Sequence, residues 1–151
     1  MTTTTSTTDT ADLRVVTTEH PNAITMRRAF DAFGRGDLET VRQSLADDCT
    51  WTASGNTPIS GVYRGWEEIS NMFLSLFELT GGTHSNALVD VLADDQHAVA
   101  IYDSTSTVDG RTATLRNVLV NEVGADGRAT RCSSLPYDLE AAEAHLGRRQ
   151  P

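Results

Sequence analysis

Two side chains in this sequence have the chemistry to move a proton, His84 and Asp103. The imidazole of His84 has an ordinary pKa of about 6.5, which suits a general base at neutral pH. The alternative is a histidine at the surface or at a strand end with a local hydrogen bond. Asp103 falls on a mostly apolar strand face, where a carboxylate must be paired, protonated or close to a pocket mouth. It is therefore an acid or base, or the partner of Arg116 or Arg111 on the next strand.

A second set of residues has the chemistry to bind a substrate. Asn117 and Asn121 share one face of the segment 112–123 with Leu119. Buried amides are expensive unless they are hydrogen-bonded, so the two asparagines indicate either a wet pocket or a satisfied network. The residues that could line an apolar cavity, and that are otherwise plain core, are Trp51, Tyr63, Met72, Phe73, Leu119 and Tyr137.

Four helical segments would position these residues. Apolar residues recur at helical spacing after Asn22, which we expect to cap the first helix, and a shorter helix follows Asp37. A third helix is predicted over 66–79. Gly81-Gly82 stops it, since glycine accepts the left-handed exit conformation. A last helix is predicted from Asp138 to Leu146.

From Thr83 onward the period of the sequence changes from helical to extended. Alternation places His84 on one strand face with Asn86, Leu88 and Asp90. Turn signals separate further strands over 98–107, 112–123 and up to Pro136, and Asp109-Gly110 is a strong hairpin signal. Consecutive hairpins predict an antiparallel sheet, and helices at the front with a meander behind predict an α+β domain. A curved sheet packed against three helices leaves a cone-shaped space, which side chains or a ligand must fill.

Length and composition predict one folded domain with a polar tail at its N-terminal end. The chain has 151 residues, 38% of them hydrophobic, which is ordinary for one globular unit. We predict a disordered, threonine-rich tail over 1–20, a folded domain over 21–147 and a short tail over 148–151. Cys49 and Cys132 have no metal-like spacing, so we expect two buried free thiols, with a disulfide or a functional thiol as the alternative. No metal site is predicted.

The charge of the chain limits its partners. Twenty-one acidic residues stand against twelve basic ones, for a formal net charge of -9. This balance repels phosphate and argues against nucleic acid or an anionic membrane surface as a partner. No apolar run is long enough to cross a membrane and no secretory signal is recognised, so the cytoplasm is the expected location.

Four stretches of sequence carry a resemblance to a known family. These stretches are Asp47-Asp48-Cys49-Thr50-Trp51, the segment from Gly61 to Ile69 that contains Tyr63-Arg64-Gly65, the segment 91–100 around Asp94-Asp95, and the closing Gly127-Arg128…Pro136-Tyr137-Asp138. Together they resemble the SnoaL-like branch of the nuclear transport factor 2-like superfamily, over roughly 23–146. The resemblance implies a cone-shaped fold, a small-molecule pocket in the mouth of the cone, and a homodimer formed through the sheet. It also implies proton transfer beside a carbonyl without metal or organic cofactor.

The catalytic groups of the characterised branches are not matched. The two aspartates of the ketosteroid isomerases would fall near Ala53 and Leu119. The last-strand aspartate of the epoxide hydrolases would fall near Ser134, and Asp103 has no arginine beside it on its own strand. A histidine that often follows the first-strand tryptophan is also missing after Trp51.

The expected function is a cofactor-independent enzyme of secondary metabolism, a cyclase, isomerase or dehydratase that acts on an apolar substrate with a carbonyl or polyene. His84 or Asp103 would move the proton, Asn117 with Tyr63 or Tyr137 would orient the substrate oxygen, and Trp51 with Phe73 would shape the cavity. One alternative is a pocket that folds a reactive chain by conformational restriction alone. The other is a non-catalytic carrier of a hydrophobic metabolite.

Overall fold

The computed structural model describes residues 19–150, so most of the predicted tail over 1–20 lies outside the described residues. The helices are α2 (Pro21–Gly34), α3 (Leu38–Gln43), α4 (Gly65–Leu79) and α5 (Leu139–Leu146). The strands are β1 (Leu45–Ala53), β2 (Gly61–Arg64), β3 (Ser85–Ala93), β4 (His97–Val108), β5 (Arg111–Val123) and β6 (Ala129–Pro136). The fold class is α+β, as predicted.

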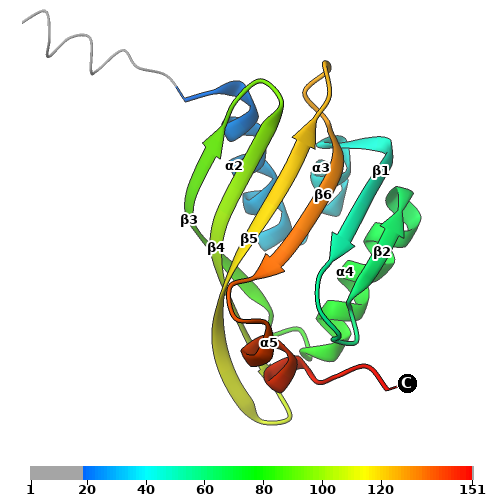
Figure 1. Ribbon diagram of the computed structural model, residues 1–151, viewed down its shortest axis with the longest axis vertical. Coiled ribbons are helices and arrows are strands. Elements are labelled where there is room, and N and C mark those ends of the chain that lie inside the picture. The colour runs from blue at the N-terminus through cyan, green and yellow to red at the C-terminus, as the bar shows by residue number, and fades with distance from the viewer. Residues whose placement is uncertain (1–18, 151) are drawn as a thin grey trace, which may run out of the picture.

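The six strands form one sheet in the order β2-β1-β6-β5-β4-β3 (Figure 1). The hairpins β3–β4, β4–β5 and β5–β6 are antiparallel, as the turn signals predict. The sequence did not predict the parallel pairing of β1 with β6, which brings Trp51 beside Cys132. This one parallel contact joins the two halves of the sheet and closes the fold around the helices.

Local capping signals set the helix boundaries. Asp37 and Asp138 accept hydrogen bonds from Thr40 N and Ala141 N and so cap α3 and α5, as predicted. The predicted cap of α2, Asn22, is two residues too late, because His20 caps this helix and Pro21 is its first residue. Asn22 lies inside the first turn, where its Nδ2 donates to Asp94 O at 2.9 Å. No helix within residues 19–150 is long and apolar enough to be a membrane span.

The turn between β4 and β5 has the residues that its geometry demands. Asp109 and Gly110 both have positive φ, 51° and 76°. A two-residue hairpin of this hand needs that conformation at both central positions, and Asp-Gly is among its preferred pairs. The long hairpin that results carries most of the residues discussed below.

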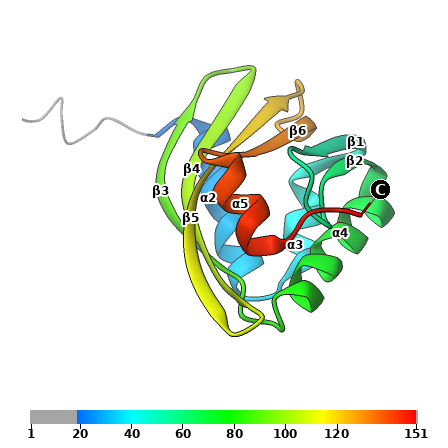
Figure 2. The ribbon, with the colours of Figure 1, turned by 60° about the horizontal axis from the view of Figure 1, so that its bottom comes forward.

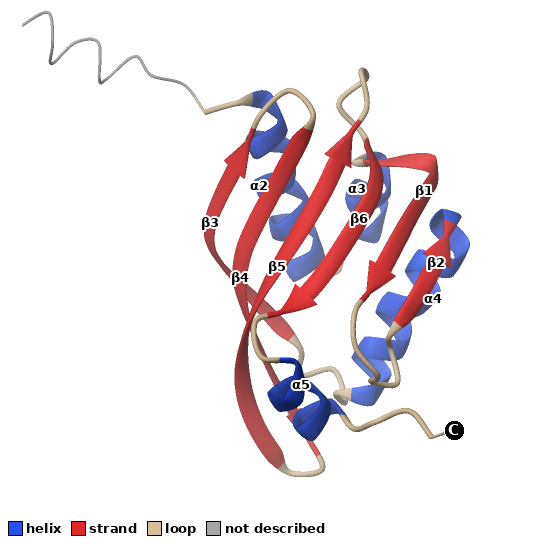
Figure 3. Cartoon of the chain, viewed as in Figure 1, coloured by secondary structure: helices blue, strands red, loops and turns tan. Residues whose placement is uncertain are grey.

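The helices lie on the concave side of the curved sheet. Figures 1 and 3 show α2 and α3 behind the strands, and α5 at the end of the sheet where the β4–β5 hairpin turns. Figure 2 shows the sheet bending around the helices, with α5 between the sheet and α4. The side chains on this inner face therefore meet the helices, while those on the opposite, outer face of the sheet do not.

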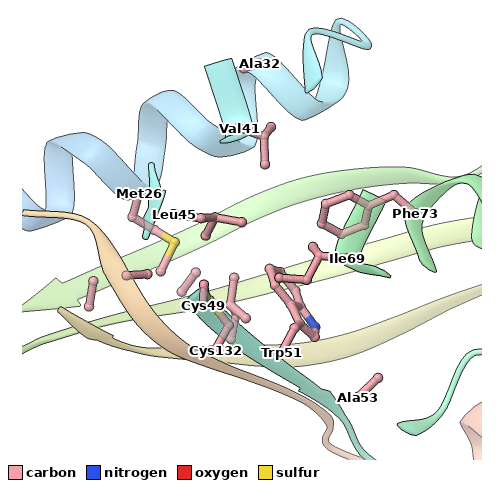
Figure 4. Packing of buried hydrophobic residues seen from close by; sticks show 14 of the residues in the cluster. Met26, Ala32, Val41, Leu45, Cys49, Trp51, Ala53, Ile69, Phe73 and Cys132 are labelled. Carbon is pink, nitrogen blue, oxygen red and sulfur yellow. The ribbon is translucent and has the colours of Figure 1, made fainter. Parts of the chain in front are cut away.

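The core is packed between α2, α4 and β1. Ile69 is fully buried, and the rings of Trp51 and Phe73 meet edge to face with centroids 5.3 Å apart (Figure 4). Cys49 and Cys132 are both free and buried, as expected, with their Sγ atoms 3.8 Å apart. The hydrogen bond to Cys49, together with burial, raises the pKa of the Cys132 thiol, which therefore stays protonated.

Candidate functional site

A cavity of about 170 Å³ lies between the helices and the inner face of β3, β4 and β5. Most of the side chains around it are apolar, including Phe30 and Phe33 of α2 and Phe73 of α4. Among the residues that the structure describes, no Asp, Glu, Lys or Arg lines this cavity. A charged ligand would lose its hydration here without gaining an opposite charge, so the cavity suits an uncharged molecule.

His84 faces the cavity, as predicted, from the position just before β3. Its ring meets the ring of Phe33 edge to face, with centroids 6.2 Å apart. Burial lowers the pKa of His84 below its usual value, and the neighbouring amide of Asn86 opposes this shift only in part. The imidazole is therefore neutral at pH 7 and can accept a proton.

Tyr102 was missed by the sequence analysis. It enters the cavity from β4, and its ring meets that of Phe30 edge to face at 5.0 Å. Burial raises the pKa of Tyr102 to about 12, so the phenol stays protonated and is a hydrogen-bond donor. Its hydroxyl makes no hydrogen bond with any residue in the described part of the chain. Period-2 counting along β4 was the available signal, since Tyr102 and Asp103 must point to opposite faces.

Asp103 lies on the outer face of the sheet and does not line the cavity. It pairs directly with Arg116 across β4 and β5, with Nε and Nη2 of the guanidinium 2.8 and 3.0 Å from its carboxylate oxygens. This hydrogen bonding holds the pKa of Asp103 below its usual value. The proposed proton-transfer role of Asp103 has no support in this position. The alternative named from the sequence, a salt bridge to Arg116, is what the structure contains.

A bulge in β3 corrects the predicted face of one further carboxylate. Leu88 pairs with Tyr102, but Asp90 pairs with Ile101, so the register shifts between them. The extra residue moves Asp90 to the outer face, while Asn86 and Leu88 stay on the inner face with His84. The carboxylate that period-2 counting placed beside His84 is therefore absent from the cavity.

The inner face of β5 lines the cavity with Asn117, Leu119 and Asn121, as the sequence predicted. Asn117 is anchored, because its Nδ2 donates to Ser104 Oγ and to Leu115 O, both at 2.9 Å. Asn121 has no such anchor, and its buried Oδ1 has no partner within residues 19–150. The two predicted asparagines thus differ, since one belongs to a satisfied network and the other does not.

The structure places some of the predicted aromatic and sulfur-containing side chains around the cavity and others outside it. Trp51, Met72 and Phe73 line the cavity, and Trp51 Nε1 donates to Ser134 Oγ at 3.2 Å. Tyr63 does not line it, because its hydroxyl donates instead to Ile59 O at 2.7 Å. Tyr137 is 63% exposed and also lies outside. Neither tyrosine is therefore placed to orient a substrate oxygen.

Helix α5 and the loop 54–60 lie at one end of the cavity. Ala142 and Leu146 of α5 line it together with Ser54, Thr57 and Ile59 of the loop. The loop is internally bonded, since the hydroxyls of Thr57 and Ser60 lie 2.9 Å apart. Two segments that are distant in sequence therefore line this end of the cavity.

Hydrogen bonds hold α5 and the chain after it in this position. His145 Nε2 lies 3.0 Å from Ser106 Oγ and 3.1 Å from Ser106 O, which ties α5 to β4. Arg149 N donates to Asn56 O at 2.8 Å, and its guanidinium donates to Ser60 O. The last residues of the described chain thus secure both α5 and the loop.

The cavity itself offers no cluster of metal ligands. Within residues 19–150, no group of three or more His, Cys, Asp or Glu side chains is arranged to hold a metal ion. The chemistry available from the protein's own side chains is therefore hydrogen bonding and proton transfer by neutral groups.

Comparison with known proteins identifies the family to which this chain belongs. The family model of the SnoaL-like domain matches residues 26–132. The chain belongs to this SnoaL-like family, as the sequence resemblance implied. An uncharacterized protein of Mycobacterium tuberculosis is 32% identical over 138 residues, which cover 91% of this chain and 97% of the relative.

Solved structures of other proteins have the same overall fold as this chain. Bal32a, from a soil-derived mobile gene cassette, superposes with a TM-score of 0.78 at 30% identity, over 83% of this chain and 95% of that chain. A protein from Jannaschia named for its likeness to SnoaL-like polyketide cyclases superposes with a TM-score of 0.72 at 18% identity, over 86% of this chain and 96% of that chain. The second likeness shows the fold alone.

Proposed function

We propose that this protein is a cofactor-independent enzyme that transfers a proton within a small, largely apolar, carbonyl-bearing molecule, as a cyclase, isomerase or dehydratase does. The observation that carries the proposal is His84, a neutral imidazole whose pKa is lowered by burial in an apolar cavity. A base of this kind needs a dry site and a pKa matched to its task. The position of the chain in the SnoaL-like family, which includes relatives named as polyketide cyclases, supports the same class.

The reaction would proceed between two neutral groups of the protein. The His84 imidazole takes a proton from the carbon beside the carbonyl, and the C–H electron pair moves into an enolate. The developing oxyanion accepts a hydrogen bond from Tyr102, whose pKa of about 12 keeps it in the donor form. The imidazolium then returns the proton to a different carbon or to a leaving hydroxyl, which restores the neutral site.

The experiment measures proton abstraction directly, without knowledge of the natural substrate. Cyclohexanone and 4-phenylcyclohexanone are incubated with the protein in D₂O, and deuterium uptake at the carbon beside the carbonyl is followed by NMR. We expect the wild-type protein to accelerate exchange about 100-fold or more over buffer, the lower end of general-base effects. The His84→Ala variant should lose this acceleration, and Tyr102→Phe should lose at least a factor of ten.

His97→Ala is the matched control, because this exposed histidine lies outside the cavity and its loss should leave exchange unchanged. Asp103→Asn tests the carboxylate that the sequence offered and should also leave exchange unchanged. Full exchange in the His84→Ala variant would remove the basis of the proposal.

A second candidate is a non-catalytic carrier of a hydrophobic metabolite. One observation favours it: Ala53 and Leu119, which stand where the isomerase branch has its aspartates, both line the cavity as apolar residues. Binding of 4-phenylcyclohexanone with no deuterium exchange above buffer would support this function over the first.

A further inference from the structure

The cavity extends along the inner face of β5 and is narrow for its length. Its lining on this strand runs from Leu115 to Asn121, about 20 Å at the usual rise of about 3.4 Å per residue. Its volume of about 170 Å³ is close to that of an engineered cavity of about 150 Å³ that holds one benzene molecule. A slim molecule fits such a space, and a broad polycyclic skeleton does not.

Two side-chain amides with unused hydrogen-bonding capacity lie far apart along this cavity. The Oδ1 atoms of Asn86 and Asn121 are buried and have no partner among the described residues. Asn86 pairs with Ser104 of β4, and Asn121 pairs with Ala98 of the same strand. These positions are separated by about 20 Å along β4 at the usual strand rise. Buried polar groups are nearly always bonded, and the Asn86 amide has the His84 imidazole beside it, so it is the Asn121 amide that requires a partner from outside the described chain.

The polar side chains around Asn121 are already hydrogen-bonded, which leaves Asn121 as the group that can bind a ligand at this end of the cavity. Three other polar side chains near this end are engaged with backbone carbonyls: Ser44 Oγ with Val41 O, Thr25 Oγ1 with Pro21 O, and Asn22 Nδ2 with Asp94 O. A satellite void of about 20 Å³ adjoins the main cavity and shares Asn121 as a lining residue. A void of this size holds one water molecule or one hydroxyl group.

The end of the cavity at Asn86, opposite to Asn121, has different chemistry. Asn86 lies beside the neutral imidazole of His84, which in the proposed function acts at the carbon next to a carbonyl. Between the two ends the lining includes Leu119 of β5 and the rings of Phe30 and Phe73. The cavity therefore presents hydrogen-bonding groups at both ends and apolar surface between them.

We propose that the ligand is a slim, uncharged molecule with an apolar middle and a polar group at each end, the carbonyl at the His84 end and a hydroxyl at the Asn121 end. The assignment of the carbonyl end rests on the proposed function, whereas the hydroxyl end rests on Asn121 alone. Asn121 is then a specificity-determining residue, because a ligand without the second hydroxyl leaves its buried amide unpaired.

The test compares two slim probes that differ by one hydroxyl, 1-decanol and 1,10-decanediol, because the extended diol with a hydrogen bond at each oxygen spans about the distance between the two ends. Their dissociation constants are measured by calorimetry with the wild-type protein and the Asn121→Leu variant. We expect the wild-type protein to bind the diol at least about 10-fold more tightly, equivalent to about 1.4 kcal/mol. Asn121→Leu should abolish this preference while it still binds 1-decanol, because leucine is branched at the same carbon and has no amide.

Ser133→Ala is the control, since this residue pairs with Val120 on the outer face and should keep the wild-type preference. Equal binding of both probes by the wild-type protein, or a preserved preference in Asn121→Leu, would overturn the inference. Failure of both probes to bind would overturn it as well.

The outcome is separable from that of the deuterium-exchange experiment. A diol preference that depends on Asn121, found together with no exchange at His84, would uphold the hydroxyl end and reject the catalytic function. Exchange that depends on His84, found together with equal binding of the two probes, would do the reverse.

Discussion

His84 and Asp103 illustrate how position decides the chemistry of a titratable side chain. Both stand in strand-forming segments that the sequence marked for proton transfer. His84 faces an apolar cavity, and burial lowers its pKa. Asp103 faces outward, and its hydrogen bonds to Arg116 lower its pKa instead. The same residue types on exchanged faces would reverse the roles, since a carboxylate in the cavity would have its pKa raised by burial.

The lowered pKa of His84 makes stability depend on pH in a defined direction. The unfolded chain binds the proton at about pH 6.5, before the folded protein does, so the free energy of unfolding falls as pH drops below this value. The slope attributable to this residue is at most about 1.4 kcal/mol per pH unit. Urea unfolding at pH 7.5 and pH 5.5 should show a smaller loss in His84→Phe than in the wild-type protein. His97→Ala serves as the reference, and a loss in His84→Phe equal to that of the wild type would contradict the assignment.

At the scale of elements, α5 depends on a small number of contacts. The helix spans only Leu139–Leu146, which is too short to be stable by itself. Asp138 caps its first turn through a hydrogen bond from Ala141 N at 3.0 Å, and His145 ties its last turn to Ser106. One end of the cavity is therefore lined by a helix that is held mainly by hydrogen bonds in its first and last turns.

Asp138→Ala should destabilise the protein by about 1 kcal/mol, the usual cost of losing a helix cap. Because the lost bond is local to α5, hydrogen exchange should speed up at the amides of this helix more than in β4 or β5. Glu140→Ala is the matched control, since Glu140 lies in the same first turn and makes no capping bond. Uniform acceleration of exchange across the whole domain would contradict local opening of α5.

At the scale of the whole molecule, the outer face of the sheet carries a patch of apolar side chains from β4 and β5. Ile101 pairs with Val118 and Val99 pairs with Val120 across β4 and β5, and all four are only partly buried. No helix of the described chain covers this face (Figure 3). The family resemblance implies a homodimer formed through the sheet, and this patch is the surface on which such a dimer would form.

We predict that the protein sediments as a dimer with twice the mass of one chain. Val120→Arg should give a monomer, because it places a charge in the middle of the apolar patch. Leu74→Arg is the control: Leu74 is 54% exposed on α4, on the helical side of the molecule, and its replacement should leave the dimer intact. Sedimentation of the wild-type protein as a monomer would contradict the prediction.

The sequence by itself determined the elements, because their signals are local. Helix caps at Asp37 and Asp138, the glycines after α4 and the Asp109-Gly110 turn each act within a few residues of the structure that they specify. All four signals lie at the ends of hairpins or helices whose boundaries the structure confirms within a residue or two. The same local counting placed Asn117 and Asn121 on the face of β5 that lines the cavity, whereas His84, which it placed on a strand, lies just before β3.

Only the tertiary structure decided which face of β4 turns inward. The inner face carries Tyr102, Ser104 and Ser106, whereas the outer face carries the more apolar Val99 and Ile101. The inner face also carries Ala98, Ala100 and Val108, which are buried, so the departure from the usual expectation is that the bulkier Val99 and Ile101 lie outward, because the inner face borders a cavity as well as a core. Likewise, the bulge at β3 and the parallel pairing of β1 with β6 join residues whose contacts depend on distant segments, and no local pattern encodes them.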